Sequence, residues 1–200
     1  MAGARSLGMK KNSVAKTIMG LVILAVGVLA IFIMAINTPD KKAETVQITA
    51  ATKQLAKNYD TAYPGTPRQV VTEYAEITKC LYASDTTEDQ IRQLAEQMRQ
   101  LMDDELIANQ SFDDFYNSLR SEIAIYRDKN KVISSYSVSS STDVKYDENQ
   151  YGSLASLYMS MNVRQDGKIS TIKEQFLLRQ DEAGHWKILG FVLANDGAEE

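Results

Sequence analysis

The chain has 200 residues, which is room for one ordinary domain and an appendage, and 44% of them are hydrophobic. The formal net charge is −4, although residues 1–16 carry four cations and no acid. Residues 37–200 therefore carry −8, since residues 17–36 have no charge. A nucleic-acid backbone requires a basic surface, so we expect no nucleic-acid partner.

The apolar residues are concentrated in one long run, TIMGLVILAVGVLAIFIMAI, at residues 17–36. A helix of this length spans roughly 30 Å, the thickness of the hydrocarbon core of a bilayer. A helix also satisfies its own backbone hydrogen bonds, which lipid cannot do. The run predicts a single-pass transmembrane helix, through which the chain contacts the cell membrane.

The charges on either side of this run predict its orientation. Residues 1–16 are purely basic, whereas residues 37–44 contain both signs. Cytoplasmic flanks carry the excess of Lys and Arg, so we expect residues 1–16 in the cytoplasm and the C-terminal domain outside the cell. A cleaved signal peptide is the alternative, but the run is longer than usual for one and residues 33–40 make a poor cleavage site.

The chain has one cysteine, Cys80, and one histidine, His185. No intrachain disulfide is possible, and Cys80 falls within an apolar helical pattern that predicts burial. A catalytic thiol needs a nearby base, and these two residues are about a hundred positions apart. No Cys/His cluster predicts zinc, so we expect neither a metal nor a cofactor.

The predicted helices follow a polar linker, residues 37–60, in which residues 52–59 have the composition of a short helix. Thr66, Pro67 and Gln69 form a start signal for a helix over 67–83. Thr87 with Gln90 marks the start of a second helix, and a third begins near Ser111. Each helix has one apolar stripe and one polar face, so each must bury its stripe against another element of the domain.

Beyond residue 131 the periodicity changes from that of a helix to that of a strand. Turn signals such as Asp166-Gly167 separate the segments that follow. Strands are predicted at 131–142, 153–163, 168–180 and 185–194, with a polar loop at 143–152. We therefore expect residues 61–195 to form an α+β domain, with three helices packed on one face of a four-stranded antiparallel sheet, and residues 196–200 to be a disordered tail.

Three segments of this domain resemble the nuclear transport factor 2-like superfamily, also described as a cystatin-like α+β cone. They are 63-YPGTPRQVVTEYAEI-77, 174-EQFLLRQDE-182 and 184-GHWKILGF-191. Together with 103-DDELIANQ-110 and 133-ISSYSVSSS-141, they also look like a family of uncharacterised membrane-anchored proteins of Gram-positive bacteria. The resemblance implies a cone-shaped fold. It does not imply one activity, because the superfamily includes isomerases, dehydratases, transport adaptors and non-enzymatic extracellular modules.

The only histidine and tryptophan lie side by side, at His185 and Trp186, directly after a turn. The turn predicts a wet position for His185, and the alternation of the strand predicts that Trp186 packs in the core. The acidic runs 103–105 and 143–148 could in principle hold a cation, but they lack the spacing of a calcium loop. No catalytic residue is assigned.

The tyrosines and one acid of the sheet suggest a pocket between sheet and helices. Alternation places Ser156, Tyr158 and Ser160 on one strand face, and Glu174, Phe176 and Leu178 on one face of the next strand. If both faces turn toward the helices, they enclose a small-ligand pocket in which a buried Glu174 would have a raised pKa and could act as a base. The alternative is that the serines and Glu174 face water. The candidate ligand-binding residues are Tyr74, Tyr136, Tyr158, Glu174, Phe176 and Trp186.

Three functions fit these expectations. The first is a membrane-anchored extracytoplasmic module, not an enzyme, that binds a small apolar ligand or an envelope protein. The second is a pocket enzyme of the isomerase or dehydratase type, with Glu174 as base. The third is a structural module that forms a homodimer through the open face of the sheet.

Overall fold

The computed structural model describes residues 48–194 of the chain. Its helices are α2 (Ala50–Leu55), α3 (Pro67–Leu81), α4 (Glu88–Arg99), α5 (Asp104–Ala108) and α6 (Phe112–Asp128). Its strands are β1 (Val132–Val138), β2 (Lys145–Asn149), β3 (Gly152–Gln165), β4 (Lys168–Gln180) and β5 (Trp186–Leu193), and a short 3-10 turn, η2 (Ser141–Asp143), separates β1 from β2. No helix of the described part is long and apolar enough to cross a bilayer. The transmembrane helix predicted at residues 17–36, the basic segment 1–16 and the tail 196–200 lie outside the described residues.

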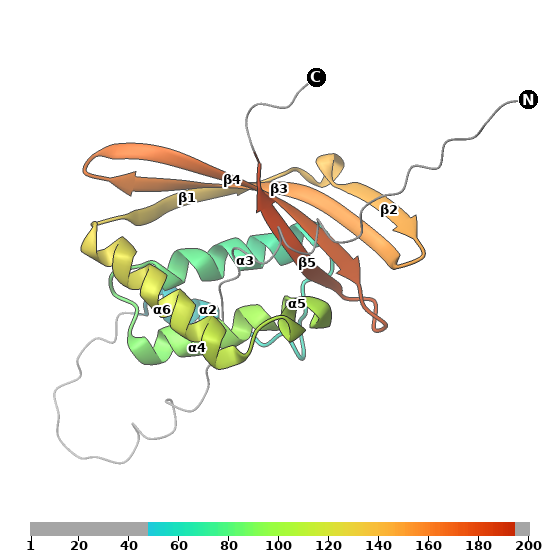
Figure 1. The fold of residues 1–200 in the computed structure, drawn as a ribbon, viewed down its shortest axis with the longest axis horizontal. Helices are drawn as coiled ribbons and strands as arrows, with labels where there is room; N and C mark the ends of the chain where they lie inside the picture. Colours follow the sequence, from blue (N-terminus) through green and yellow to red (C-terminus); the bar gives the residue numbers. More distant parts are fainter. Residues whose placement is uncertain (1–47, 195–200) are drawn as a thin grey trace, which may run out of the picture.

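The molecule has two layers, with the helices on one side of an antiparallel sheet (Figure 1). The strand order is β1-β3-β4-β5, and β2 pairs with β3 as well. The α+β class and the single helical layer are therefore as predicted. The strand count was wrong, because within residues 48–194 the sheet has five strands and four were expected.

The additional strand, β2, lies in the segment 143–152 that was predicted to be a loop. All five of its residues are exposed, so its sequence has no alternation of apolar and polar residues that would reveal a strand. It forms because Lys145–Asn149 pairs with Ser156–Gly152 of β3, beyond the stretch of β3 that pairs with β1. A strand that depends on its neighbour in this way is visible only in the tertiary structure.

Two short helices accompany the three predicted main helices; α5 was not predicted, and α2 overlaps the short helix predicted at 52–59. Helix α5 has five residues, too few for an apolar stripe, and its N-cap Asp103 accepts a hydrogen bond from the backbone N–H of Glu105. Helix α2 (Ala50–Leu55) lies inside the predicted linker 37–60, near the short helix expected at 52–59.

The three main helices begin where their caps were predicted. Thr66 caps α3 with Pro67 in its first turn, Thr87 and Gln90 form a capping box on α4, and Ser111 caps α6. Each cap satisfies backbone N–H groups that the helix cannot pair internally. Because these signals are local, the sequence alone was sufficient to locate the helix starts.

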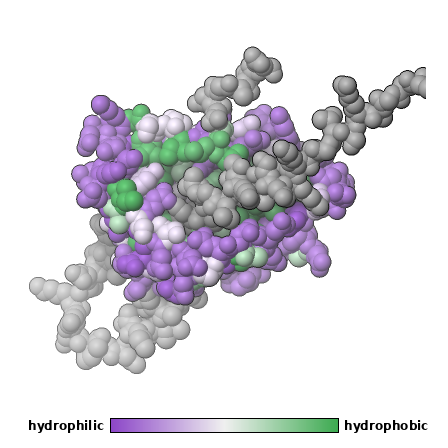
Figure 2. All heavy atoms as spheres, viewed as in Figure 1, coloured by the Kyte–Doolittle hydropathy of each residue, from purple (hydrophilic) through white to green (hydrophobic). Residues whose placement is uncertain are grey.

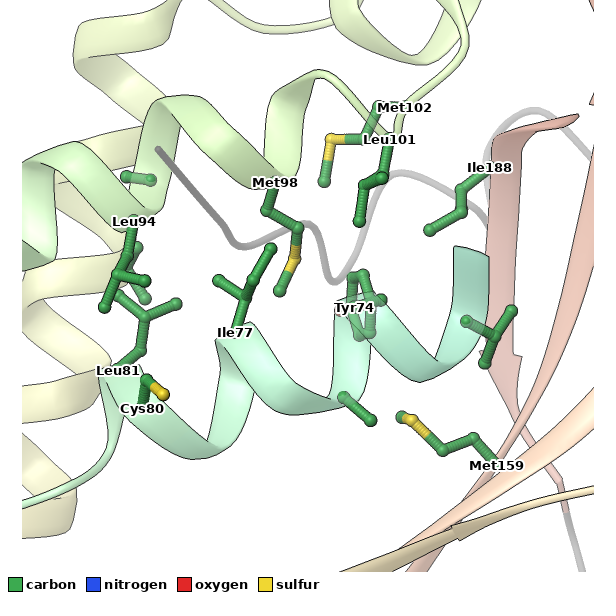
Figure 3. Close-up of a cluster of buried hydrophobic side chains, with 14 of the residues drawn as sticks. Tyr74, Ile77, Cys80, Leu81, Leu94, Met98, Leu101, Met102, Met159 and Ile188 are labelled. Atoms are coloured by element: carbon green, nitrogen blue, oxygen red, sulfur yellow. The ribbon is translucent and has the colours of Figure 1, made fainter. Parts of the chain in front are cut away.

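The core is centred on α3, which packs against α4 on one side and the sheet on the other. Its buried side chains include Tyr74, Ile77 and Leu81, each no more than 3% exposed. Figure 3 shows them facing Leu94, Met98 and Leu101 of α4 and its C-terminal end, with Met159 and Ile188 approaching from the sheet. Cys80 is buried in the same cluster, as predicted, and burial raises the pKa of its thiol to about 11.

The hairpin between β3 and β4 follows its turn signal. Asp166 and Gly167 both have positive φ, 49° and 76°, as a two-residue turn that matches the twist of the strands requires. The turn sets the register in which Met159 lies opposite Glu174 and Leu157 lies opposite Phe176. These four side chains therefore share the face of the sheet that meets the helices.

Most of the face seen in Figure 2 is hydrophilic, and hydrophobic residues gather along the sheet in the upper part of the view. Exposed apolar side chains of the strands include Ile169 on β4 and Val192 and Leu193 on β5. The apolar surface of the described part is therefore associated with the strands more than with the helices.

Candidate ligand cavity

A cavity of about 320 Å³ lies between the sheet and helices α3 and α6. Its apolar wall consists of Ile133, Met161, Val163, Ile172, Phe191 and Leu193. Its polar groups are Tyr74, Thr78, Tyr82, Glu122, Tyr126 and Glu174. Tyr74 is 3% exposed and Leu193 is 56% exposed, so the cavity runs from the core to the surface of the molecule.

Two carboxyl groups enter the cavity from opposite layers. Glu174 lies on β4 in the same alternation as the buried Phe176 and Leu178, so it points toward the helices. Glu122 lies on α6, three residues after the buried Leu119 and next to Ile123, at the border of the apolar stripe. Periodicity directs Glu174 inward, whereas Glu122 has a border position and lines the cavity because of the way α6 packs.

The environment of the two acids disfavours their charged forms. Burial and the nearby Glu122 carboxyl raise the pKa of Glu174 to about 7, from an ordinary value of 4.5. Burial also raises the pKa of Glu122, although a hydrogen bond from the Tyr82 hydroxyl counteracts part of this effect. Among the described residues, the cavity lining contains no Lys, Arg or His that would compensate these charges.

Three tyrosines supply hydroxyl groups and ring surface to the cavity. The Tyr74 ring makes edge contacts with Phe176 and Phe191, at centroid distances of 5.0 and 5.6 Å. The rings of Tyr82 and Tyr126 lie 4.6 Å apart. Burial raises the pKa of all three phenols, so each stays protonated at neutral pH and can donate a hydrogen bond.

The structure brings together two of the six residues proposed from the sequence as ligand-binding. Tyr74 and Glu174 line the cavity, and the fully buried Phe176 packs behind the Tyr74 ring. Tyr136 also lies on the inner face of the sheet, but its hydroxyl donates to Glu76 at 2.5 Å, outside the cavity lining.

Tyr158 and Trp186 lie away from the cavity. Tyr158 pairs with Gln175, so Tyr158 and its neighbours Ser156 and Ser160 occupy the outer face of the sheet, opposite to Glu174. The two strand faces considered in the sequence analysis therefore do not coincide. Trp186 pairs with Gln180, six residues along β4 from Glu174 and thus about 20 Å away, and its ring packs on Tyr146.

Sequence reasoning missed Glu122, Tyr82 and Tyr126 as cavity residues. Tyr126 follows Leu119 and Ile123 at the spacing of one helix face, but nothing in the sequence indicated an opening there. The available signal was Glu122 itself, an acid between the apolar positions Leu119 and Ile123. An acid at such a position either reaches around to solvent or faces a cavity, and only the packing decides which.

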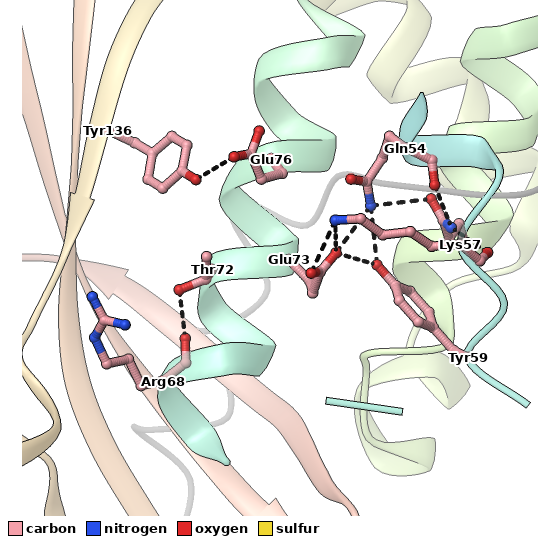
Figure 4. A network of polar contacts seen from close by, with 9 residues as sticks. Gln54, Lys57, Tyr59, Arg68, Thr72, Glu73, Glu76 and Tyr136 are labelled. Carbon is pink, nitrogen blue, oxygen red and sulfur yellow. Dashed lines mark hydrogen bonds and ion pairs between the residues drawn. The ribbon is translucent and has the colours of Figure 1, made fainter. Parts of the chain in front are cut away.

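A second group of polar side chains joins α2 to α3 and α4. Glu73 accepts hydrogen bonds from Lys57 at 2.7 Å, Tyr59 at 2.8 Å and Gln54 at 3.1 Å. Gln97 of α4 donates to the backbone oxygen of Gln54. Figure 4 shows this network on one side of α3, and Glu76 reaching toward Tyr136 on the other side. Every group in the network has a partner, so its role is to hold α2 in place.

The remaining polar candidates have structural roles. Asp103 and Glu105 both pair with Arg179, at 2.6 and 3.2 Å. His185 follows the turn 181–184, with its side chain 46% exposed and 3.6 Å from Asp181. Within residues 48–194, no group of three or more His, Cys, Asp or Glu side chains is placed to hold a metal ion.

The fold and the cavity define the class of protein, a two-layer α+β domain with a cavity between its helices and its sheet. The chain belongs to the family described as Domain of unknown function (DUF6715), whose model matches residues 9–191. No curated protein matches the chain.

Proposed function

We propose that this protein is a membrane-anchored binding module whose α+β domain holds a small ligand in the cavity between α3, α6 and the sheet. The observation that carries the proposal is the cavity itself, in which mainly apolar walls surround two acids and three phenols. Small-molecule sites have this composition, and their volumes begin at about 300 Å³. The proposal is for binding without catalysis.

The proposed location is the outer face of the cell membrane, with residues 1–16 in the cytoplasm. The sequence of residues 17–36 and the basic flank before it support this orientation. The family match begins at residue 9, so it includes the apolar run together with the domain. Because one family model covers both the proposed anchor and the domain, the match is consistent with a role at the membrane surface.

The proposed fold family is the nuclear transport factor 2-like superfamily. Support comes from the antiparallel sheet with all described helices on one face, and from a cavity that opens between the two layers. The proposed binding site lies in this cavity.

The test is a fragment screen on the full chain in lipid nanodiscs, with ligand-detected NMR as the readout. Ile172 lines the cavity, and Ile172→Trp fills it. Ile169→Trp is the matched control, because Ile169 lies on the same strand, is 65% exposed and is outside the lining. We expect fragments that bind the wild type and Ile169→Trp but not Ile172→Trp. Binding that survives in Ile172→Trp, or a screen without hits, would contradict the proposal.

One observation favours an enzyme of the isomerase or dehydratase type as the second candidate. The pKa of Glu174 is about 7, close to the value at which a carboxylate can both accept and return a proton at neutral pH. Tyrosine hydroxyls in the same cavity could donate a hydrogen bond to a carbonyl oxygen. The test is NMR of α-proton exchange in a small cyclic ketone. An enzyme would accelerate the exchange and Glu174→Gln would abolish it, whereas equal rates in both proteins would exclude this candidate.

A further inference from the structure

We infer that the cavity ligand is an organic cation, a small molecule with an apolar body and an ammonium group that lies between Glu122, Glu174 and the aromatic rings. This inference rests on the proposed ligand-binding function and specifies the chemistry of the same site.

The first argument is charge. Glu174 on β4 and Glu122 on α6 face one cavity, and the other titratable groups facing them are the phenols Tyr74, Tyr82 and Tyr126. The segments contributed by β1, β3 and β5 are apolar. Lys173 follows the opposite alternation of β4, and its ammonium lies 5.3 Å from the Tyr158 ring on the outer face. Two acids without a described cation in the lining provide a site that a positively charged ligand would complete.

The second argument is the aromatic surface. Rings of Tyr74, Tyr82, Tyr126 and Phe191 line the same cavity as the acids. An ammonium group within about 6 Å of a ring centroid is attracted by the negative face of the ring, and desolvation strengthens the attraction. Carboxylates beside aromatic rings therefore favour an alkylammonium group over a neutral polar group of the same size.

The other ligand classes fit less well. Ca²⁺ and Mg²⁺ take six or more oxygen ligands, and Zn²⁺ usually takes four ligands that include Cys or His, whereas this cavity offers two carboxyl groups in apolar walls. An anion would meet two like charges. A neutral ligand would leave the repulsion between the carboxyl groups unrelieved, and that repulsion contributes to the raised pKa of Glu174.

Three probes of nearly equal shape and different charge test the inference, namely 2-phenylethylamine, 2-phenylethanol and phenylacetate. Calorimetric titrations use the full chain in phosphatidylcholine nanodiscs at pH 8, with empty nanodiscs to correct for partitioning. We expect 2-phenylethylamine to bind about tenfold more tightly than 2-phenylethanol, as one ion pair in a partly buried site would give, and phenylacetate to bind most weakly. Ile172→Trp should abolish the binding of all three.

The double variant Glu122→Gln/Glu174→Gln should lose the preference for the amine and still bind 2-phenylethanol. Glu182→Gln, on the exposed turn 181–184, should leave the preference unchanged. At pH 5.5 the amine stays cationic, whereas Glu174 is mostly protonated. The affinity of the protein for 2-phenylethylamine should therefore fall several-fold, and its affinity for 2-phenylethanol should stay the same.

The outcomes separate this inference from the proposed function. If the alcohol binds in the cavity as tightly as the amine, the ligand is not selected for charge and the inference fails, while the binding function stands. If the amine binds equally well to the double variant, the acids do not recognise it and the inference fails again. If none of the probes binds, the inference fails, and the fragment screen tests the cavity separately.

Discussion

Glu174 and Glu73 are the same residue type in opposite electrostatic environments. Burial raises the pKa of Glu174 to about 7, and the repulsion from Glu122 is the second, smaller cause of this rise. Burial would also raise the pKa of Glu73, but hydrogen bonds from Lys57, Gln54 and Tyr59 outweigh it and hold the pKa below its usual value. The difference lies in the partners, because Glu73 has three donors, whereas Glu174 faces a second acid. A fully partnered acid stabilises the fold, and a poorly partnered one in a cavity indicates a site.

The first prediction concerns the effect of Glu174 on stability. A carboxyl group with a raised pKa binds its proton more tightly in the folded state, so its contribution to the free energy of unfolding is lost as the pH rises from about 4.5 to about 7. Glu174→Gln removes the charge and should be more stable than the wild type at pH 8, by about 1–3 kcal/mol, with little difference at pH 5. Chemical denaturation at both pH values measures this. Glu182→Gln is the exposed control, and a Glu174→Gln variant that is less stable at pH 8 would contradict the assignment.

The second prediction concerns Glu73 and has the opposite sign. A lowered pKa means that the charged form of Glu73 stabilises the fold. This stabilisation is present above the ordinary pKa of a glutamate, and it is lost as the pH falls through the pKa of Glu73 in the folded state. Glu73→Gln should therefore cost about 1–2 kcal/mol at pH 7, and less in acid. Urea denaturation at pH 7 and pH 4 checks the sign. Glu96→Gln, in an exposed pair with Arg92, should change stability by less than about 0.5 kcal/mol.

At the scale of elements, the connection between α4 and α5 pairs with the edge of β5 at Ile188. Met102 forms a parallel bridge with Ile188, and the backbone N–H of Asp103 donates to the oxygen of Ile188 at 2.9 Å. The Asp103 side chain, 5% exposed, binds the guanidinium of Arg179 through two hydrogen bonds. At Ile188 the edge of β5 is therefore not free to pair with another chain.

The third prediction tests this contact. Asp103→Ala removes the cap of α5 and leaves Arg179 with only Glu105, so we expect a loss of about 2–4 kcal/mol in the free energy of unfolding. Urea denaturation measures the loss, and hydrogen exchange should show faster exchange at Ile188. Asp104→Ala, at an exposed neighbouring position, is the control and should have a small effect. Equal stabilities of the two variants would contradict the role of Asp103.

At the scale of the whole molecule, the fourth prediction concerns the anchor. If residues 17–36 span the bilayer, the full chain in native membranes should resist extraction by alkaline carbonate and dissolve in detergent. In intact cells, protease added outside should digest the domain that contains α3 to β5. Release of the full chain by carbonate, or protection of the domain from protease, would rule out the proposed placement.

The fifth prediction concerns self-association through the outer face of the sheet. Tyr158, Leu177 and Val192 lie on this face and are between 36% and 41% exposed. If the protein is a homodimer through this face, light scattering of the detergent-solubilised chain should give twice the monomer mass, and Leu177→Lys should give the monomer. A wild type that is monomeric over a range of concentrations would exclude the structural dimer.

The sequence by itself determined the helix starts at Pro67, Glu88 and Phe112, and the turn at Asp166-Gly167. These features depend on caps, stripes and turn residues within a few positions, so local physical chemistry is sufficient. It also located most of the strands, because their buried faces alternate. Strand β2 and helix α5 were missed because neither carries a periodic apolar signal of its own.

Only the tertiary structure showed that a cavity exists and which residues line it. The sequence identified Glu174 and Tyr74 as candidates, but it could not show that Glu122, 52 positions earlier, faces the same space. It also could not show that Tyr158 points to the opposite side of the sheet from Glu174. Strand register and helix docking are set by contacts between residues far apart in the chain. The pKa of a buried acid depends on those contacts, so the chemistry of the site arises only when the two layers pack together.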